Sequence, residues 1–302
     1  MGRAANPNAI KTSRFDKGFY FVVNLLLFLV LLITLYPIIY VVSSSFSSAK
    51  AVSMGQVILL PVEPSLEGYQ AVFKNKDILT GYGNTILYTA VGTVLNVFLT
   101  LIAAFGLSRR ELVGFKLLNF LFAFTMWFNG GMIPTYLLMK DLGLINSRWA
   151  MWVPGMIGVW NVIITRTYFQ NSVPEELFES ASLDGCGYFT YFSRVVMPLS
   201  GAIIAVIALF YGVGHWNAYF NAFLYLNNKE LFPLQIILRD ILIQNQLDSQ
   251  MMLDATSSDV NMWMADLLKY SVIMVACVPV WCIYPFVQKF FVKGVMVGAI
   301  KG

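Results

Sequence analysis

The chain has 302 residues, of which 58% are hydrophobic and only 12% are charged, and its formal net charge is +4. A soluble domain carries about 25% charged residues, so this composition excludes a soluble protein and makes membrane lipid its expected solvent. The positive balance then reflects the cytoplasmic lysines and arginines of a membrane protein, and no nucleic-acid partner is expected. Three cysteines without paired spacing, Cys186, Cys277 and Cys282, predict neither disulfides nor a metal site.

Six apolar runs are long enough to cross the hydrocarbon core, which takes about 20 helical residues. The first run is too long for the core of a signal peptide, so we expect it to be retained after the segment 1–18. The fourth run is the weakest because Pro154 and two glycines interrupt it. The predicted spans are Phe19–Val42, Asn84–Leu107, Lys116–Met139, Trp149–Phe169, Leu199–Leu226 and Leu267–Phe291. We therefore expect an all-α integral membrane protein with one six-span domain, 19–291, and a tail, 292–302.

The positions of lysine and arginine predict the orientation of these spans. With the N-terminus inside, 12 of the 20 basic residues fall on the cytoplasmic side and 8 on the outer side. This modest bias places both termini in the cytoplasm, together with the loop 171–198 between spans four and five. The long segments 43–83 and 227–266 then lie outside. The second of them has apolar residues at helical spacing, which predicts a short amphipathic helix near the outer interface: Leu234, Ile237, Leu238, Ile241 and Leu242.

The loop 171–198 is polar and has the sequence signals of a short helical hairpin. Ser172 followed by Glu175 predicts a capping box at the start of its first helix. Gly185 and Gly187 are expected to end that helix, and a second short helix follows. An ordinary amphipathic connector on the inner leaflet fits these signals as well as a docking element does. Connections between helices usually take about 2–8 residues, however, and this loop is much longer.

The same loop resembles the cytoplasmic loop of ABC importer permeases, which reads E-A-A, three residues, G, nine residues, I, any residue, L-P. The following residues stand at the fixed positions with the family's spacing: Glu179, Ser180, Ala181, Gly185 and Pro198. Ser180, Val195 and Met197 depart from the pattern but are conservative in size. Nearly the whole chain, including 214–226 and 231–242, is similar to the branch that handles oligosaccharides or polysaccharide fragments. The chain thus resembles the permease subunit of a carbohydrate-type ABC importer, similar to the second permease of the maltose system.

The resemblance implies a binding-protein-dependent sugar importer in a bacterial cell membrane. It implies four kinds of partner: a homologous second permease forming a heterodimer, two ATP-binding subunits that hold ATP and Mg, an extracellular solute-binding protein, and an oligosaccharide cargo. The loop corresponds to the family's coupling helix, which sits in a cleft of the ATPase. The residues expected to contact the ATPase are Glu175, Leu177, Phe178, Glu179, Ser180, Ala181, Asp184, Gly185, Phe189 and Pro198.

No catalytic or cofactor site is expected in the chain itself. The sequence has no G-x-x-x-x-G-K-[ST] phosphate-binding loop, so ATP hydrolysis is assigned to separate subunits. The single histidine, His215, has no neighbouring nucleophile and acid and is expected to be structural. An intramembrane enzyme would need a catalytic pair, and none stands out. The alternative function is an ion-coupled secondary sugar transporter, which usually needs a charged group buried in mid-span; the predicted spans offer none.

A belt of amides and aromatic rings in the spans predicts a sugar pathway. Amides can hydrogen-bond sugar hydroxyls, and rings can stack on the C–H faces of the sugar. Polar groups in hydrocarbon are costly unless they face the bundle interior. Interhelical hydrogen bonding and interfacial anchoring remain an open alternative for each residue. The residues favoured for the pathway are Trp127, Asn129, Trp160, Asn161, Trp216, Asn217 and Asn221.

Overall fold

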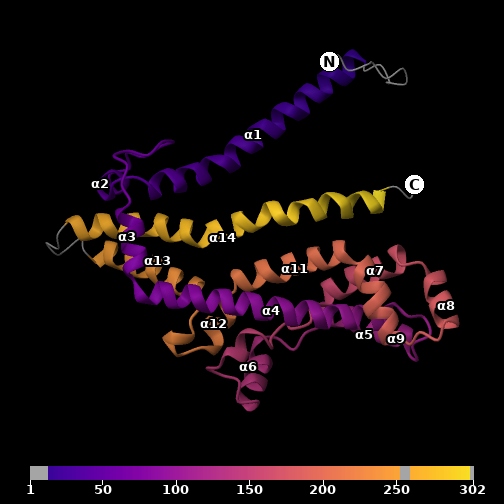
Figure 1. The fold of residues 1–302 in the computed structure, drawn as a ribbon. Helices are drawn as coiled ribbons and strands as arrows, with labels where there is room; N and C mark the ends of the chain where they lie inside the picture. The colour runs from indigo at the N-terminus through magenta and orange to yellow at the C-terminus, as the bar shows by residue number, and fades with distance from the viewer. Residues whose placement is uncertain (1–12, 252–258, 300–302) are drawn as a thin grey trace. The chain divides into compact units, whose positions relative to one another are not determined.

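The computed structural model describes residues 13–251 and 259–299, and every regular element in that part of the chain is a helix (Figure 1). The helices belong to two compact units. The first unit comprises the described residues of 1–71 and 252–274, and the second comprises those of 72–251 and 275–302. Parts of three predicted segments lie outside the described residues: 1–12 of the N-terminal segment, 252–258 of the second outer segment, and 300–302 of the tail.

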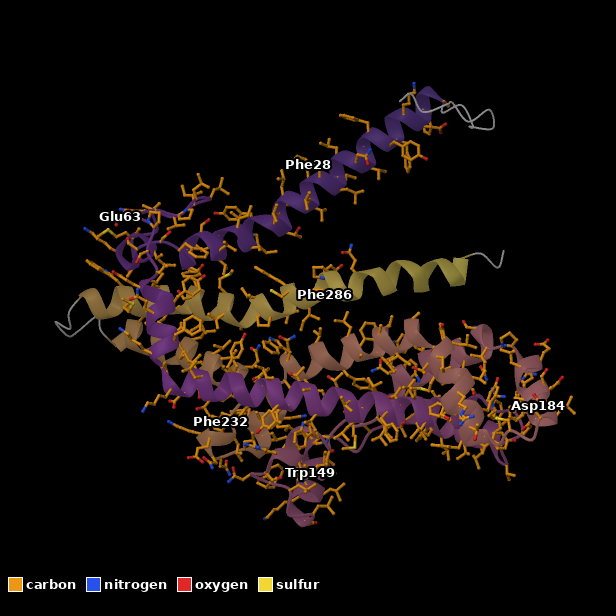
Figure 2. The ribbon with its side chains drawn as sticks, viewed as in Figure 1. Phe28, Glu63, Trp149, Asp184, Phe232 and Phe286 are labelled. Atoms are coloured by element: carbon orange, nitrogen blue, oxygen red, sulfur yellow. The ribbon has the colours of Figure 1, made fainter. Side chains whose placement is uncertain are left out.

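The first unit contains α1 (Arg14–Ser45), α2 (Ala49–Ser53) and the beginnings of α3 (Glu67–Lys74) and α14 (Asp259–Ala299). A capping box begins α1: Ser13 Oγ accepts from Phe15 N–H, and Asp16 accepts from Ser13 N–H. Apolar side chains are exposed all along this helix, as Phe28 illustrates (Figure 2). A helix that is apolar on every side is expected to lie in lipid.

The second unit is built around α4 (Lys76–Ser108), which packs against α7 (Val159–Ser172), α11 (Gly201–Trp216) and α13 (Leu234–Met251). Polar side chains of α4 hold the segment that leads into α13. Asn84 Nδ2 donates to the carbonyls of Glu230 and Phe232 at 2.7 and 3.1 Å. Thr85 Oγ accepts from Leu234 N–H at 2.8 Å. The predicted helix within 227–266 is thus confirmed, with Leu234 and Leu238 buried.

Within the part of the chain that the structure describes, three helices are long and apolar enough to cross a membrane: Phe15–Ser45, Lys76–Ser108 and Trp263–Phe286. They correspond to the first, second and sixth predicted spans. Two helix pairs are bent, and counting each as one span gives up to five candidates among the described residues. Six spans and the orientation of the termini therefore stay predictions.

The other three predicted spans are not continuous helices. Lys116–Met139 is divided into α5 (Phe115–Trp127) and α6 (Met132–Asp141), which are bent by 110° at a break where Gly131 has φ +85°. Leu199–Leu226 is divided into α11 and α12 (Phe220–Tyr225). The remaining elements of the second unit are η1 (Arg148–Met151), α8 (Glu175–Leu183), α9 (Tyr188–Tyr191), η2 (Phe192–Val196), α10 (Met197–Leu199) and η3 (Lys229–Leu231).

The fourth predicted span, Trp149–Phe169, is wrong as a single helix. It begins in the 3₁₀ turn η1, and α7 starts only at Val159. Pro154 and Gly155 lie between the two, and Gly155 has φ +76°, a conformation that interrupts a helix. The helix α7 has 14 residues, so it is about 21 Å long at 1.5 Å per residue. That length is short of the roughly 30 Å hydrocarbon core.

Candidate functional site

The candidate site is the polar hairpin formed by α8 and α9, which lies at one end of α4 in the second unit (Figure 1). The helix α8 starts directly after Pro174, and Ser172 is the last residue of α7. The predicted capping box of Ser172 with Glu175 is therefore wrong. Proline disfavours a helical conformation in the residue before it, and Val173 is extended, which separates the two helices.

The C-terminus of α8 is closed by a Schellman motif around Gly185. Gly185 has φ +77°, and its N–H donates to the Ser182 carbonyl at 3.0 Å. The N–H of Cys186 donates to the Ala181 carbonyl at 2.9 Å. These two bonds pair carbonyls that the helix leaves free, so the expectation that Gly185 ends the helix is confirmed. Gly187 has φ −74° and ψ 162° and instead precedes α9.

The second leg of the hairpin runs through α9, the π-helical turn η2 and α10 before it reaches α11. Pro198 lies within α10, and because it lacks an N–H it cannot complete a regular α-helical ladder, which favours the wider turn before it. The chain bends by 83° between Leu199 and Gly201, not at Pro198. At this bend Ser200 is buried, and its hydroxyl donates to the Val196 carbonyl at 2.7 Å.

The inner face of the hairpin is aromatic and packs on the chain itself. The Phe178 side chain is only 9% exposed, and its ring stacks on Tyr188 at 5.2 Å and meets the edge of Tyr191 at 5.1 Å. The guanidinium of Arg109 lies 4.8 Å from the Phe178 ring centre. Phe178, one of the residues expected to reach the ATPase, is therefore occupied within this chain.

The outer face of the hairpin exposes acids and apolar side chains (Figure 2, around Asp184). Leu183 is 91% exposed and Phe189 is 81% exposed. Of the other residues expected to contact the ATPase, Ala181 is half-buried, and the following are exposed: Glu175, Leu177, Glu179, Ser180, Asp184, Gly185 and Pro198. Sequence reasoning missed Leu183. Leu183 lies on the side of α8 opposite the apolar face that Leu177, Phe178 and Ala181 form. A leucine on the polar side of the helix was the sequence signal that could have predicted its exposure.

Two tyrosines of the hairpin are held in their neutral form. Tyr188 donates to Glu111 Oε2 at 2.6 Å, and this hydrogen bond raises the pKa of Tyr188 above its ordinary value. Burial raises the pKa of Tyr191, although the neighbouring Arg109 opposes the effect. Among the described residues, no group of three or more His, Cys, Asp or Glu side chains is arranged to hold a metal ion.

The residues predicted for the sugar pathway lie on separate segments, and several have local bonds. Trp216 is buried, and its Nε1 donates to the Ala276 carbonyl of α14 at 3.0 Å. Asn217 Nδ2 donates to the Val213 carbonyl, and Asn129 Oδ1 accepts from Gly131 N–H, each at 3.0 Å. The remaining four comprise two exposed rings and two half-buried amides: Trp127, Trp160, Asn161 and Asn221.

His215 packs against Gly92 on α4. A Cβ added at Gly92 would come within 2.4 Å of His215 Nε2, so the glycine leaves the space that the imidazole occupies. Glycine at a helix crossing lets two membrane helices approach closely. This contact agrees with a structural role for the histidine.

Comparison with known proteins gives several extensive similarities, although no family model matches the chain. The chain is 42% identical over 272 residues to the polygalacturonan/rhamnogalacturonan transport system permease protein YtcP of Bacillus subtilis, covering 90% of this chain and 94% of that protein. It is 39% identical over 273 residues to protein LplC of the same organism, covering 89% and 90%. One chain in the crystal structure of a bacterial ABC transporter involved in the import of the acidic polysaccharide alginate superimposes with a TM-score of 0.83 at 35% identity, covering 94% of this chain and 100% of that one.

Proposed function

The chain belongs to the permease subunits of carbohydrate ABC transporters, and we propose that it forms half of an import pathway driven through the hairpin 171–198. Such permeases are integral membrane proteins that work in general with a second permease, ATPase subunits and a binding protein. In this proposal the complex has two ATP-binding subunits, and the hairpin binds in a cleft of one of them. A homologous permease completes the pathway, and an extracellular solute-binding protein delivers the cargo. ATP and Mg are bound by the partner subunits, because this chain has no phosphate-binding loop.

The observation that carries the proposal is the two-sidedness of the hairpin. Its inner face is fixed to the end of α4 through Phe178, while its outer face exposes Leu183 and Phe189 among acidic side chains. Large apolar side chains in a polar setting are typical anchors of a protein interface. Glu179 and Asp184 beside them favour a partner surface that carries lysine or arginine.

For the cargo we propose an oligosaccharide derived from an acidic polysaccharide. Two similarities support this class: YtcP is named for polygalacturonan and rhamnogalacturonan transport, and the structural neighbour is described as an importer of the acidic polysaccharide alginate. The ion-coupled alternative is disfavoured, because a chain of a bacterial ABC transporter superimposes on 94% of this chain at 35% identity.

Reconstitution of the complete importer tests the proposal. Glu179→Lys and Phe189→Ser should each reduce co-purification of the ATPase subunits and abolish ATP hydrolysis stimulated by the loaded binding protein. Asp141→Lys is the control, because Asp141 is an exposed acid at the end of α6, outside the hairpin. If both hairpin variants keep wild-type association and stimulation, the coupling role is wrong. Uptake of galacturonate oligomers, with neutral maltooligomers for comparison, tests the cargo class.

A further inference from the structure

Arg109 lies at the junction between the longest helix of the second unit and the hairpin. The helix α4 has 33 residues and ends at Ser108, and Arg109 is its C-cap residue. The Arg109 side chain is only 10% exposed. A cation at this point interacts favourably with the negative end of the helix, so the charge is well placed with respect to α4 itself.

The guanidinium is enclosed by aromatic rings from three elements. Its Cζ lies 5.2 Å from the ring centre of Phe105 on α4, 4.8 Å from that of Phe178 on α8, and 5.4 Å from that of Tyr191 on α9. All three distances are within the range of cation–π attraction. A single side chain thus contacts both legs of the hairpin and the helix that the hairpin adjoins.

An ion pair completes this arrangement. Arg109 Nη1 lies 3.4 Å from Oε1 of Glu175, in the first turn of α8. Beside the pair is a cleft of about 340 Å³ whose walls include Gln170 of α7 and Glu175. We call Arg109, Phe105, Phe178, Tyr191 and Glu175 the arginine clasp.

We propose that Arg109 is a positioning residue that transmits movement of the hairpin to α4, a step that rests on the coupling function proposed above. The clasp connects α8 and α9 to α4, and α4 in turn packs along α7, α11 and α13. In this proposal the guanidinium carries part of a hairpin displacement into α4, in addition to the backbone connections of the hairpin to α7 and α11.

The chemistry of the site distinguishes a role of Arg109 in transmitting movement from a role in packing alone. Replacing a buried ion pair by apolar residues of similar volume is often neutral or stabilising, whereas removing one partner is costly only when the other charge stays buried. The Glu175 side chain is 62% exposed, so it remains solvated when Arg109 becomes methionine. Arg109 Nε is also buried without a hydrogen-bond acceptor. If the site only held the hairpin in shape, Arg109→Met would serve equally well. Transmission instead requires that the side chain at position 109 attract α8 and α9 at the same time, as the guanidinium does through the Phe178 and Tyr191 rings.

The test uses the complete reconstituted importer with Arg109→Met, Arg109→Lys and, as the matched control, Arg110→Met at the neighbouring exposed arginine. Arg109→Met should retain the ATPase subunits at the wild-type level. Its ATP hydrolysis stimulated by the loaded binding protein should fall about fivefold or more, the size of a typical allosteric coupling. Arg109→Lys should be intermediate, because lysine keeps the charge but loses the planar group that covers the rings. Arg110→Met should behave as wild type.

Phe178→Leu provides a second variant that keeps apolar volume but removes the central ring, and it should show the same uncoupling with intact association. Wild-type stimulation in Arg109→Met would overturn the inference and leave the proposed function standing. Loss of the ATPase subunits in Arg109→Met would also overturn it, since Arg109 would then only maintain the docking surface. A wild-type complex that neither associates nor responds to the binding protein would refute the proposed function itself.

Discussion

Substitution of Gly185 by alanine, asparagine or valine should destabilise the hairpin in proportion to the cost of a left-handed backbone. Gly185 has φ +77°, and a Cβ added there would meet nothing within 4 Å. The cost is therefore conformational and not steric. A left-handed conformation costs an L-residue about 1–2 kcal/mol, and alanine returns about 0.4–1 kcal/mol by restricting the unfolded chain. For Gly185→Ala we expect a net loss of about 1 kcal/mol in the local free energy of opening.

Asparagine tolerates the left-handed region better than alanine, and a β-branched residue tolerates it least. The expected order of stability is therefore glycine, asparagine, alanine, valine. Hydrogen exchange measures it directly, because the amides of Gly185 and Cys186 form the two bonds that close α8. A loss of about 1 kcal/mol accelerates exchange from the open state roughly fivefold.

The control is Gly187→Ala. Gly187 has φ −74° and ψ 162°, which any residue adopts, and a Cβ there also meets nothing within 4 Å. Exchange at Gly185 and Cys186 should stay within about twofold of wild type, because the bonds that close α8 are unaffected. Equal exchange in Gly185→Ala and wild type, or faster exchange in asparagine than in alanine, would refute the left-handed explanation.

Three further predictions concern other contacts. Phe178→Ala should lower the unfolding free energy of the hairpin by about 3–5 kcal/mol, as measured by proteolysis, whereas Phe189→Ala should leave it nearly unchanged because that ring is exposed. Trp216→Phe removes the hydrogen bond to α14 and should lower thermal stability by about 0.6–2 kcal/mol while cargo selectivity is retained; changed selectivity would argue for a pathway role. The Tyr188 pKa is raised by its bond to Glu111, so this contact is complete below pH about 10 and is lost as pH rises through the raised pKa. Proteolysis should therefore show an alkaline step that Tyr188→Phe abolishes.

The sequence predicts the long helices well and the broken ones poorly, for a physical reason. A continuous apolar run such as Phe19–Val42 can satisfy its backbone in lipid only as a helix, so it lies inside the observed Arg14–Ser45. Composition does not reveal a bend. The stretch Lys116–Met139 is apolar enough for a span, yet φ +85° at Gly131 and the extended backbone at Phe128 divide it. The pair Gly130–Gly131 permits this conformation but does not predict it, because glycine is frequent in membrane helices that stay continuous.

The hairpin shows the same division. Gly185 was predictable because a helix terminus has a local signature. The burial of Phe178 was not predictable, because the cation that covers its ring, Arg109, belongs to a distant part of the sequence. The ion pair of the same arginine with Glu175 likewise spans 66 positions. Periodicity places Phe178 on an apolar face but does not say whether that face meets a partner subunit or the same chain. The structure therefore divides the residues predicted to contact the ATPase into two groups, one on the inner face of the hairpin and one on its outer face.

The extent of uncoupling expected at Arg109 follows from the routes that leave the hairpin. Two of them are backbone connections: Val173 and Pro174 join α7 to α8, and the bend at Ser200 joins α10 to α11. The third, to α4, depends on the arginine clasp together with the exposed bond of Tyr188 to Glu111. Arg109→Met leaves both backbone connections intact, so its stimulation should be reduced but not abolished. Adding Tyr188→Phe to Arg109→Met should reduce it further, because the double variant loses the two polar links between the hairpin and the chain at the end of α4. The packing of the Phe105 ring on Tyr191 and Phe192 remains, so some stimulation should persist.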